Sequence, residues 1–150
     1  MSNVLERYRN VSSMEFHRNA VWLRDEMERF CMREKNVPRR YRAIITYPLV
    51  EAFDTLLNLI EEANLIYTDT EEKLRERKEV QAQAIRQVSR IYGILQHAAG
   101  LLWKEILQQA EENKNRQRLE RAINVYAEGL LREERLLKAW RDNTHLVRKR

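Results

Sequence analysis

Apolar residues recur every three or four positions along most of the chain, which is the spacing of an amphipathic α-helix. The first such stretch follows Ser12, whose spacing to Glu15 is that of a capping box, and it stops before Asn36 and Pro38. Its apolar positions are Phe16, Ala20, Leu23, Met27, Phe30 and Cys31. This pattern predicts a first helix, with residues 1–11 as a loosely attached turn or a disordered end.

A second helix is predicted from Thr46 to about Tyr67, with Pro48 in its first turn, where the missing N–H costs nothing. One face carries Leu49, Phe53, Leu56, Ile60, Ala63 and Tyr67. Further apolar residues widen that face beyond one stripe: Leu57, Leu59, Leu65 and Ile66. We therefore expect this helix to have neighbours on two sides, and the last three of these residues to reach an oligomer or partner interface.

The start of a third helix is indicated by two capping-box spacings, Thr68–Glu71 and Asp69–Glu72. One apolar face then continues for more than 30 residues, through Leu74, Val80, Ala84, Val88, Ile91, Leu95, Ala98, Leu102 and Ile106. Gly93 and Gly100 lie off this face, where they permit close approach of another backbone or a phosphate. The helix either extends towards the polar turn Glu111–Asn115 or ends near Gly100.

A fourth helix carries Leu119, Ile123, Tyr126, Leu130, Leu137 and Trp140 on one face and gives way to the basic end Arg148–Arg150. Only 3 Gly and 2 Pro occur against 43% apolar residues, so turns are few and helices long. We predict an all-α, up-and-down four-helix bundle with long third and fourth helices. The expected parts are an N-terminal extension at 1–12, the bundle at 13–142 and a basic tail at 143–150, which is a solvated end or an arm that orders on RNA.

Residues that could perform chemistry are sparse. The single cysteine, Cys31, excludes an internal disulfide and a cysteine-rich zinc site and fits a core position. His17, His97 and His145 fall on different elements, and no nucleotide-binding or nucleophile motif occurs, so we expect no enzyme activity, metal or cofactor. No apolar run is long enough for a bilayer and no signal-peptide core is present, which predicts a cytoplasmic protein without membrane contact.

Charge is distributed unevenly along the chain. Lys and Arg number 28 against 23 Asp and Glu, a net charge of +5. Residues 46–69 hold five acids and no base, whereas residues 113–150 hold 11 bases and five acids. Such a separation could orient protomers head to tail or bind a polyanion.

Helical spacing places the cations in stripes away from the apolar faces. The fourth helix carries Lys114, Arg118, Arg121, Arg132 and Arg135, the third carries Arg86, Arg90 and Lys104 beside His97, and the first carries Arg18, Arg29 and Arg33 beside Trp22. Arg39, Arg40 and Arg42 follow between the first two helices. We predict that these cations contact nucleic-acid phosphates; Trp22 would stack on a base or, more in keeping with aromatic residues at interfaces, join an oligomer contact. The alternative is an ordinary set of solvated faces with i,i+4 ion pairs.

Four short stretches carry a further pattern: Val37–Arg42 with a P-x-x-x-R motif, the leucine-rich and acidic Leu56–Asn64, Val88–Leu95, and Tyr126–Trp140. In content and order they resemble the accessory variability determinant (Avd) proteins of diversity-generating retroelements, over roughly residues 14–142. The chain departs from that family's pattern with Lys138-Ala139-Trp140 in place of G-G-W, with Gln96 in place of an arginine, and with an insertion around 103–116.

The resemblance implies a four-helix protomer that forms a basic, barrel-like homopentamer. It also implies binding to the retroelement's reverse transcriptase and to its structured template RNA or an RNA/DNA hybrid, in support of mutagenic cDNA synthesis. The reverse transcriptase would perform the chemistry. The alternative is a structural or protein-interaction bundle, of the related ribosomal-RNA intervening-sequence class or an adaptor, that forms oligomers and has no nucleic-acid role.

Overall fold

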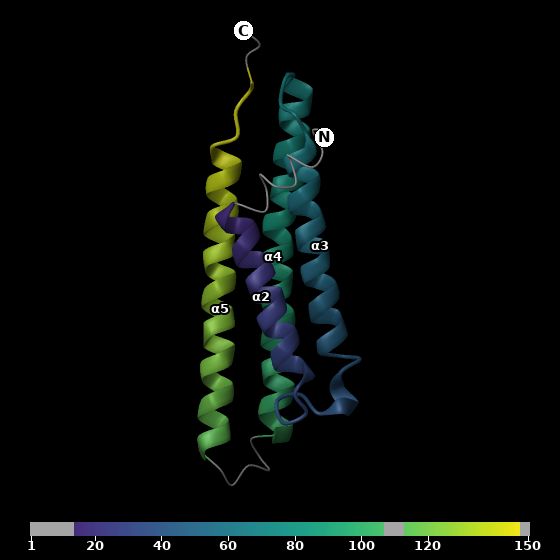
Figure 1. Ribbon diagram of the computed structural model, residues 1–150, viewed down its shortest axis with the longest axis vertical. Coiled ribbons are helices and arrows are strands. Elements are labelled where there is room, and N and C mark those ends of the chain that lie inside the picture. The colour runs from purple at the N-terminus through teal and green to yellow at the C-terminus, as the bar shows by residue number, and fades with distance from the viewer. Residues whose placement is uncertain (1–13, 107–112, 148–150) are drawn as a thin grey trace, which may run out of the picture.

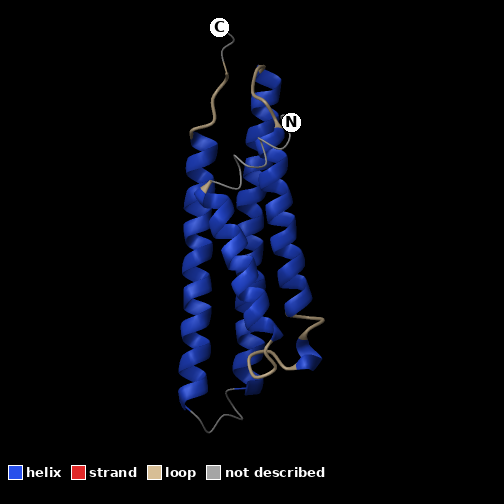
Figure 2. Cartoon of the chain, in the orientation of Figure 1, coloured by secondary structure: helices blue, strands red, loops and turns tan. Residues whose placement is uncertain are grey.

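The computed structural model describes residues 14–106 and 113–147, and this part of the chain consists of helices and their connections (Figure 2). The helices are α2 (Glu15–Met32), the short 3-10 helix η1 (Arg39–Tyr41), α3 (Thr46–Leu65), α4 (Glu71–Ile106) and α5 (Asn113–Asp142). The predicted all-α four-helix fold is confirmed. Outside the described part lie the expected extension 1–12, the connection 107–112, the basic end Arg148–Arg150 and the side chains of Ile106 and Lys114.

The four helices form an up-and-down bundle (Figure 1). α2 packs against α3 and α5, and α4 packs against the same two helices, so α2 and α4 occupy diagonal corners, with α2 in front of α4 in Figure 1. α4 has 36 residues and α2 has 18, which correspond to about 54 and 27 Å of helix. The alternative that the third helix ends near Gly100 is therefore wrong. None of the described helices is apolar over a length that could cross a bilayer.

The core follows the predicted apolar faces closely. Most of the positions that the spacing assigned to the interior are buried, among them Phe16, Ala20, Leu23, Met27, Cys31, Leu49, Phe53, Leu56, Ile60, Val88, Ile91, Leu95, Tyr126, Leu130 and Leu137. Four others are half-buried: Phe30, Leu74, Ile123 and Trp140. Tyr67 was expected on the buried face but is 48% exposed, because α3 ends at Leu65 and the chain turns away two residues earlier than predicted. Leu57 and Leu59 are half-buried against this same core.

Two helix starts differ from the prediction. α2 begins at Glu15 without a side-chain cap, so Glu15 is the first helical residue and not the third residue of a capping box. α4 begins at Glu71, and the hydroxyl of Thr70 accepts a hydrogen bond from the backbone N–H three residues later, at 3.2 Å. The cap is therefore Thr70 and not Thr68 or Asp69.

Thr68 instead ties the end of the chain to the turn between α3 and α4. Its hydroxyl donates to the carbonyl of His145 at 2.7 Å, and its carbonyl accepts from the N–H of Val147 at 2.8 Å. Thr144 is buried, and Gln81 of α4 donates to its hydroxyl at 2.9 Å. These three hydrogen bonds thus fasten the described segment after α5 to the bundle, and sequence periodicity does not reveal them.

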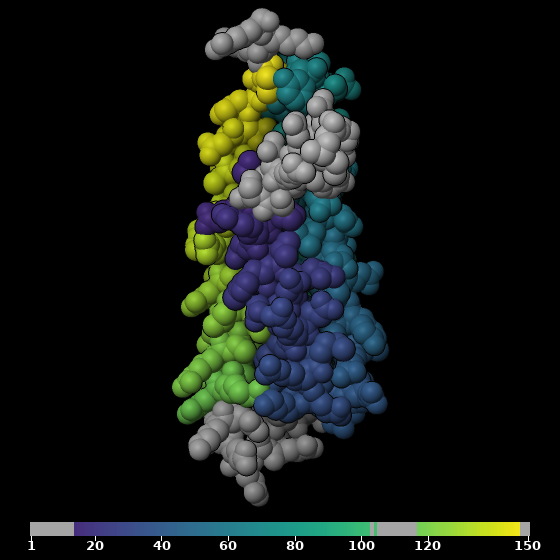
Figure 3. Space-filling view, in the orientation of Figure 1, coloured from purple at the N-terminus to yellow at the C-terminus, as the bar shows by residue number. Residues whose placement is uncertain are grey.

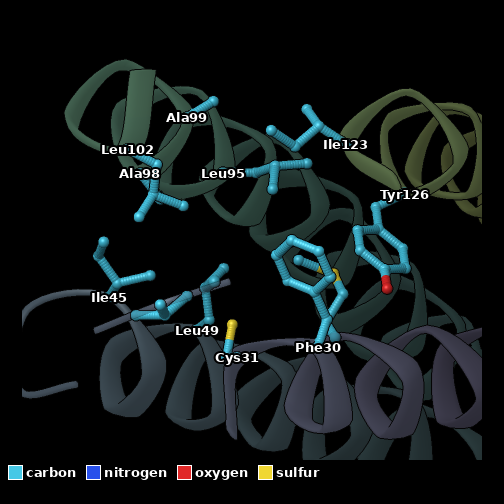
Figure 4. A pocket seen from close by; sticks show the side chains of 12 residues that line it. Phe30, Cys31, Ile45, Leu49, Leu95, Ala98, Ala99, Leu102, Ile123 and Tyr126 are labelled. Carbon is cyan, nitrogen blue, oxygen red and sulfur yellow. The ribbon is translucent and has the colours of Figure 1, made fainter. Parts of the chain in front are cut away.

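A small cavity lies in the core near Cys31 (Figure 4). Its volume is about 20 Å³, and its walls are apolar side chains from all four helices, including Leu49, Leu95 and Ile123. Burial raises the pKa of Cys31 to about 11, so the thiol stays neutral at physiological pH. The cavity is a packing defect that offers no charged group for chemistry.

Candidate nucleic-acid interface

Basic side chains of α2 and α5 meet along the seam between these two helices, which is visible in Figure 3 as the border between the purple-to-blue and green-to-yellow surfaces. Two open hollows lie on this α2–α5 seam, and together they are lined by five arginines and two carboxylates: Arg18, Arg29, Arg33, Arg118, Arg132, Glu15 and Glu26. The basic stripes predicted for the first and fourth helices therefore form one surface, although about 100 residues of sequence separate them.

The first hollow, here the Trp22 hollow, has a volume of about 370 Å³ and is lined by Glu15, Arg18, Asn19, Trp22 and Arg132. The indole of Trp22 is off the core, as predicted, and 47% exposed. Arg132 forms an ion pair with Glu15 across the seam, whereas Arg18 has no ion-pair partner among residues 14–106 and 113–147. The hollow therefore combines an accessible aromatic ring with an unpaired cation.

The second hollow, here the Arg118 hollow, has a volume of about 330 Å³ and lies between the end of α2 and the first turns of α5. Its charged residues are Glu26, Arg29, Arg33 and Arg118. Glu26 pairs with Arg29 at 3.2 Å, and no carboxylate of the described residues pairs with Arg33 or Arg118. The four charges leave a local excess of two positive charges, which favours an anionic ligand.

A buried carboxyl group adjoins the Trp22 hollow through Asn19. Glu133 of α5 is completely buried, and Asn19 donates its amide N–H to Oε1 of Glu133 at 3.2 Å and to the carbonyl of Gly129 at 3.1 Å. Burial raises the pKa of Glu133 to about 8, against the smaller lowering effects of the Asn19 hydrogen bond and the charge of Arg132. At neutral pH this carboxyl is therefore mostly protonated.

Gly129 lets α2 and α5 approach closely beside that pair. A methyl group at this position would lie 2.4 Å from Cδ2 of Leu23, a side chain that is fully buried. Gly93 and Gly100 of α4, which were expected to permit such an approach, have no atom within 4 Å of the corresponding position and face open space. The close helix contact within the described chain therefore lies at Gly129 of α5, and the approach of another backbone or a phosphate to Gly93 and Gly100 stays a prediction.

The predicted cations of α4 lie on a different side of the molecule. Arg86, Arg90 and Lys104 are all exposed. Arg86 pairs with Glu79 at 3.2 Å, while Arg90 and Lys104 have no ion pair in the described part of the chain. Since α4 is diagonal to α2, this α4 row cannot join the α2–α5 seam, and the predicted basic residues divide between two surfaces.

The remaining predicted cations occupy the ends and the outer side of the bundle. Arg39 and Arg40 are exposed in η1, and the guanidinium of Arg40 lies 5.0 Å from the ring centre of Tyr41. Arg42 is half-buried and donates to the carbonyl of Met32 at 3.2 Å, so it holds the end of α2. Arg121 and Arg135 are exposed on α5 without a described ion-pair partner.

The residues expected at an oligomer or partner interface are only partly available. Leu59 packs against the core of its own chain, and Leu65 and Ile66 are half-buried. More accessible apolar surface occurs on α5, where Val125 and Leu131 are 49% and 48% exposed. The exposed side of α3 is acidic, with Glu51, Asp54 and Glu62, and Asp54 accepts from Arg24 of α2 at 2.7 Å.

Three polar residues at the seam were not found by sequence reasoning: Asn19, Asn36 and Glu133. A signal existed for Glu133, because it falls three residues after Leu130 and four before Leu137, on the buried stripe of α5. No signal identified the two asparagines, since their partners are distant backbone and side-chain groups.

No protein-family model, curated protein or solved structure matches the chain. The fold and the surface therefore define its class by themselves: an all-α four-helix bundle with a basic, arginine-lined seam between two of its helices.

Proposed function

We propose that this protein is a non-catalytic, nucleic-acid-binding accessory subunit, which acts in the cytoplasm and binds RNA along the α2–α5 seam. The observation that carries the proposal is the gathering of five arginines from two sequence-distant segments, α2 with its C-cap and α5, around two hollows that hold two carboxylates among the described residues. Arginine is well suited to phosphate because its planar guanidinium donates paired hydrogen bonds. The exposed indole of Trp22 supplies a face on which a base can stack.

The dimensions of the seam agree with a short single-stranded segment. Arg18 of α2 and Arg33, which directly follows α2, are 15 residues apart, which corresponds to about 22 Å at the helical rise. At about 3.4 Å per stacked nucleotide, that length accommodates about six nucleotides. The α4 row of Arg86, Arg90 and Lys104 would form a second phosphate-binding surface on the opposite corner.

The resemblance to Avd proteins supports a specific setting for this activity. In that setting the chain assembles as a homopentamer, binds the reverse transcriptase and the structured template RNA of a diversity-generating retroelement, or an RNA/DNA hybrid, and supports mutagenic cDNA synthesis. The reverse transcriptase performs the chemistry, and this chain positions RNA.

Binding of a dye-labelled single-stranded RNA of 12 nucleotides, followed by fluorescence anisotropy at several salt concentrations, tests the proposal. Each phosphate contact contributes about 0.7 to the slope of log K against log salt for single strands. The double variant Arg18→Glu/Arg33→Glu, with one change in each hollow, should therefore bind more weakly, with a slope smaller by about 1.4. Both residues are exposed and lack a described ion pair, so the fold should be retained.

The matched control is Arg75→Glu/Lys78→Glu, which makes the same charge change near the start of α4, outside both basic surfaces. This control should change affinity little and leave the slope intact. Equal weakening by both double variants would show that only net charge matters, and the seam would then not be the binding surface.

A protein-interaction bundle without a nucleic-acid role is the second candidate, and the exposed Trp22, Val125 and Leu131 favour it. The basic seam and the acidic side of α3 could also pair between protomers. Light scattering over a range of protein concentrations, with and without RNA, separates the two candidates: oligomerisation without any RNA affinity at low salt would favour the second.

A further inference from the structure

The Arg118 hollow contains two buried polar atoms whose hydrogen-bonding capacity is unused. One is Nη2 of Arg118, and the other is Oδ1 of Asn36. Asn36 is only 1% exposed. Neither atom has a hydrogen-bond partner, although both residues line the same hollow. Leaving buried polar groups unpaired is unfavourable, most of all for a charged donor.

The chemical character of the two atoms is fixed by their surroundings. The amide nitrogen of Asn36 donates to the carbonyl of Phe30 at 2.9 Å, so the unpartnered atom of this amide is the acceptor oxygen. The guanidinium nitrogen of Arg118 can only donate. The hollow therefore offers a positively charged donor and a neutral acceptor, with Arg33 at its rim as a second unpaired cation.

A ligand that satisfies both atoms needs an anionic oxygen and a hydroxyl group. A phosphodiester alone supplies the anionic oxygen for Arg118 but has no proton to donate to Asn36. A ribonucleotide supplies both, because its 2′-hydroxyl donates a hydrogen bond. A deoxyribonucleotide lacks that hydroxyl and would leave the Asn36 oxygen unpaired.

We propose that the Arg118 hollow binds one ribonucleotide unit of an RNA strand, with the phosphate on Arg33 and Arg118 and the 2′-hydroxyl on Oδ1 of Asn36. This inference rests on the proposed nucleic-acid function and adds to it a site that distinguishes RNA from DNA. To reach the two buried atoms, the sugar and phosphate enter between Arg29 and Arg33, which are the exposed members of the hollow; the side chain of Arg29 moves aside and that of Arg33 turns onto the phosphate.

The test compares three labelled 12-nucleotide uridine strands with ribose, deoxyribose or 2′-O-methylribose sugars, which differ in the hydroxyl donor and form little internal structure. The wild-type chain should bind the ribose strand roughly three- to tenfold more tightly than either of the others. This ratio is the contribution expected from about one additional hydrogen bond. Changing the ligand avoids a substitution of Asn36, whose amide also holds the end of α2.

Protein variants then locate the effect. Arg118→Gln should weaken binding of the ribose strand roughly tenfold, as expected for a hydrogen bond to a charged group, and reduce the ribose preference towards one. Arg75→Gln, the control with the same loss of charge on exposed α4 surface, should keep the preference. Far-UV circular dichroism verifies that both variants are folded.

Several results would overturn the inference. Equal binding of the three strands by the wild-type chain would show that no sugar hydroxyl is read, while leaving general RNA binding intact. Unchanged binding by Arg118→Gln would indicate that Arg118 and Asn36 satisfy each other after a small rotation. Absence of binding by any strand at low salt would refute the proposed function itself, and this site with it.

Discussion

The buried carboxyl of Glu133 should make the stability of the bundle depend on pH, and the substitution Glu133→Gln should remove that dependence. Glutamine has nearly the same shape and keeps an oxygen that can accept the hydrogen bond from Asn19, but it cannot ionise. The variant therefore isolates the effect of one proton at the contact between α2 and α5.

The sign and the magnitude of this pH dependence follow from the pKa of Glu133 in the folded chain and its pKa in the unfolded chain. The carboxyl titrates at about 8 in the folded chain and at its ordinary value of 4.5 in the unfolded chain. Between these pH values the folded state holds the proton and the unfolded state releases it, so the free energy of unfolding falls as pH rises. The slope is about 1.4 kcal/mol per pH unit, and the loss over the whole interval is about 5 kcal/mol.

Urea unfolding at fixed protein concentration, followed by circular dichroism at pH 5, 6, 7, 8 and 9, measures this effect. The variant and the wild type should have similar stability near pH 5, and the variant should be more stable by about 3 kcal/mol at pH 7. Other titrating groups contribute to both curves and cancel in the difference.

Glu134→Gln is the matched control, since Glu134 is the next residue, half-buried, and paired with Lys138 at 2.8 Å. Its effect should be below about 1 kcal/mol and nearly constant over this pH range. A difference between Glu133→Gln and wild type that does not grow with pH would refute the reasoning, because it would show that Glu133 titrates normally.

Three further predictions concern packing and reactivity. Gly129→Ala should destabilise the fold by about 1 to 2 kcal/mol in urea unfolding, since its methyl group collides with Leu23. Gly93→Ala on open surface should stabilise the fold by up to about 1 kcal/mol. Equal effects of the two substitutions would show that the close contact at Gly129 is absent. Cys31 should react with a thiol reagent only after unfolding, because it is buried and its pKa is about 11, and rapid labelling of the folded chain would contradict this. Thr68→Val should cost about 1 kcal/mol and increase amide exchange in the segment after α5; unchanged exchange would exclude the fastening role of this hydroxyl.

The fold was largely predictable because the apolar spacing of each helix is long and regular. The four stripes reproduce the buried face of each helix, and the long third and fourth helices follow directly from them. Helix ends were less predictable. Thr68 and Thr70 are chemically alike, and only the tertiary contact with His145 decides that Thr70 caps α4 while Thr68 binds the end of the chain.

The candidate site was predictable only as separate stripes. Spacing placed Arg18 and Arg118 on exposed sides of their own helices, but it contains no information on which helices become neighbours. The packing of α2 against α5 brings the stripes of these two helices together, and the diagonal position of α4 excludes the third stripe from them. The charge of Glu133 was misleading for a related reason: a carboxyl group usually indicates solvent, and burial is possible here because the proton stays bound.

The diagonal placement of α2 and α4 has a consequence for the number of RNA strands that one protomer can hold. A rigid polyanion cannot lie on both the α2–α5 seam and the α4 row unless it wraps around the bundle, whereas two separate strands can occupy them together. Each protomer would then be bivalent, and the size of its assemblies with RNA would depend on the ratio of protein to RNA. Near equal amounts, protomers and strands would link into large networks. An excess of either component would break these networks into small complexes.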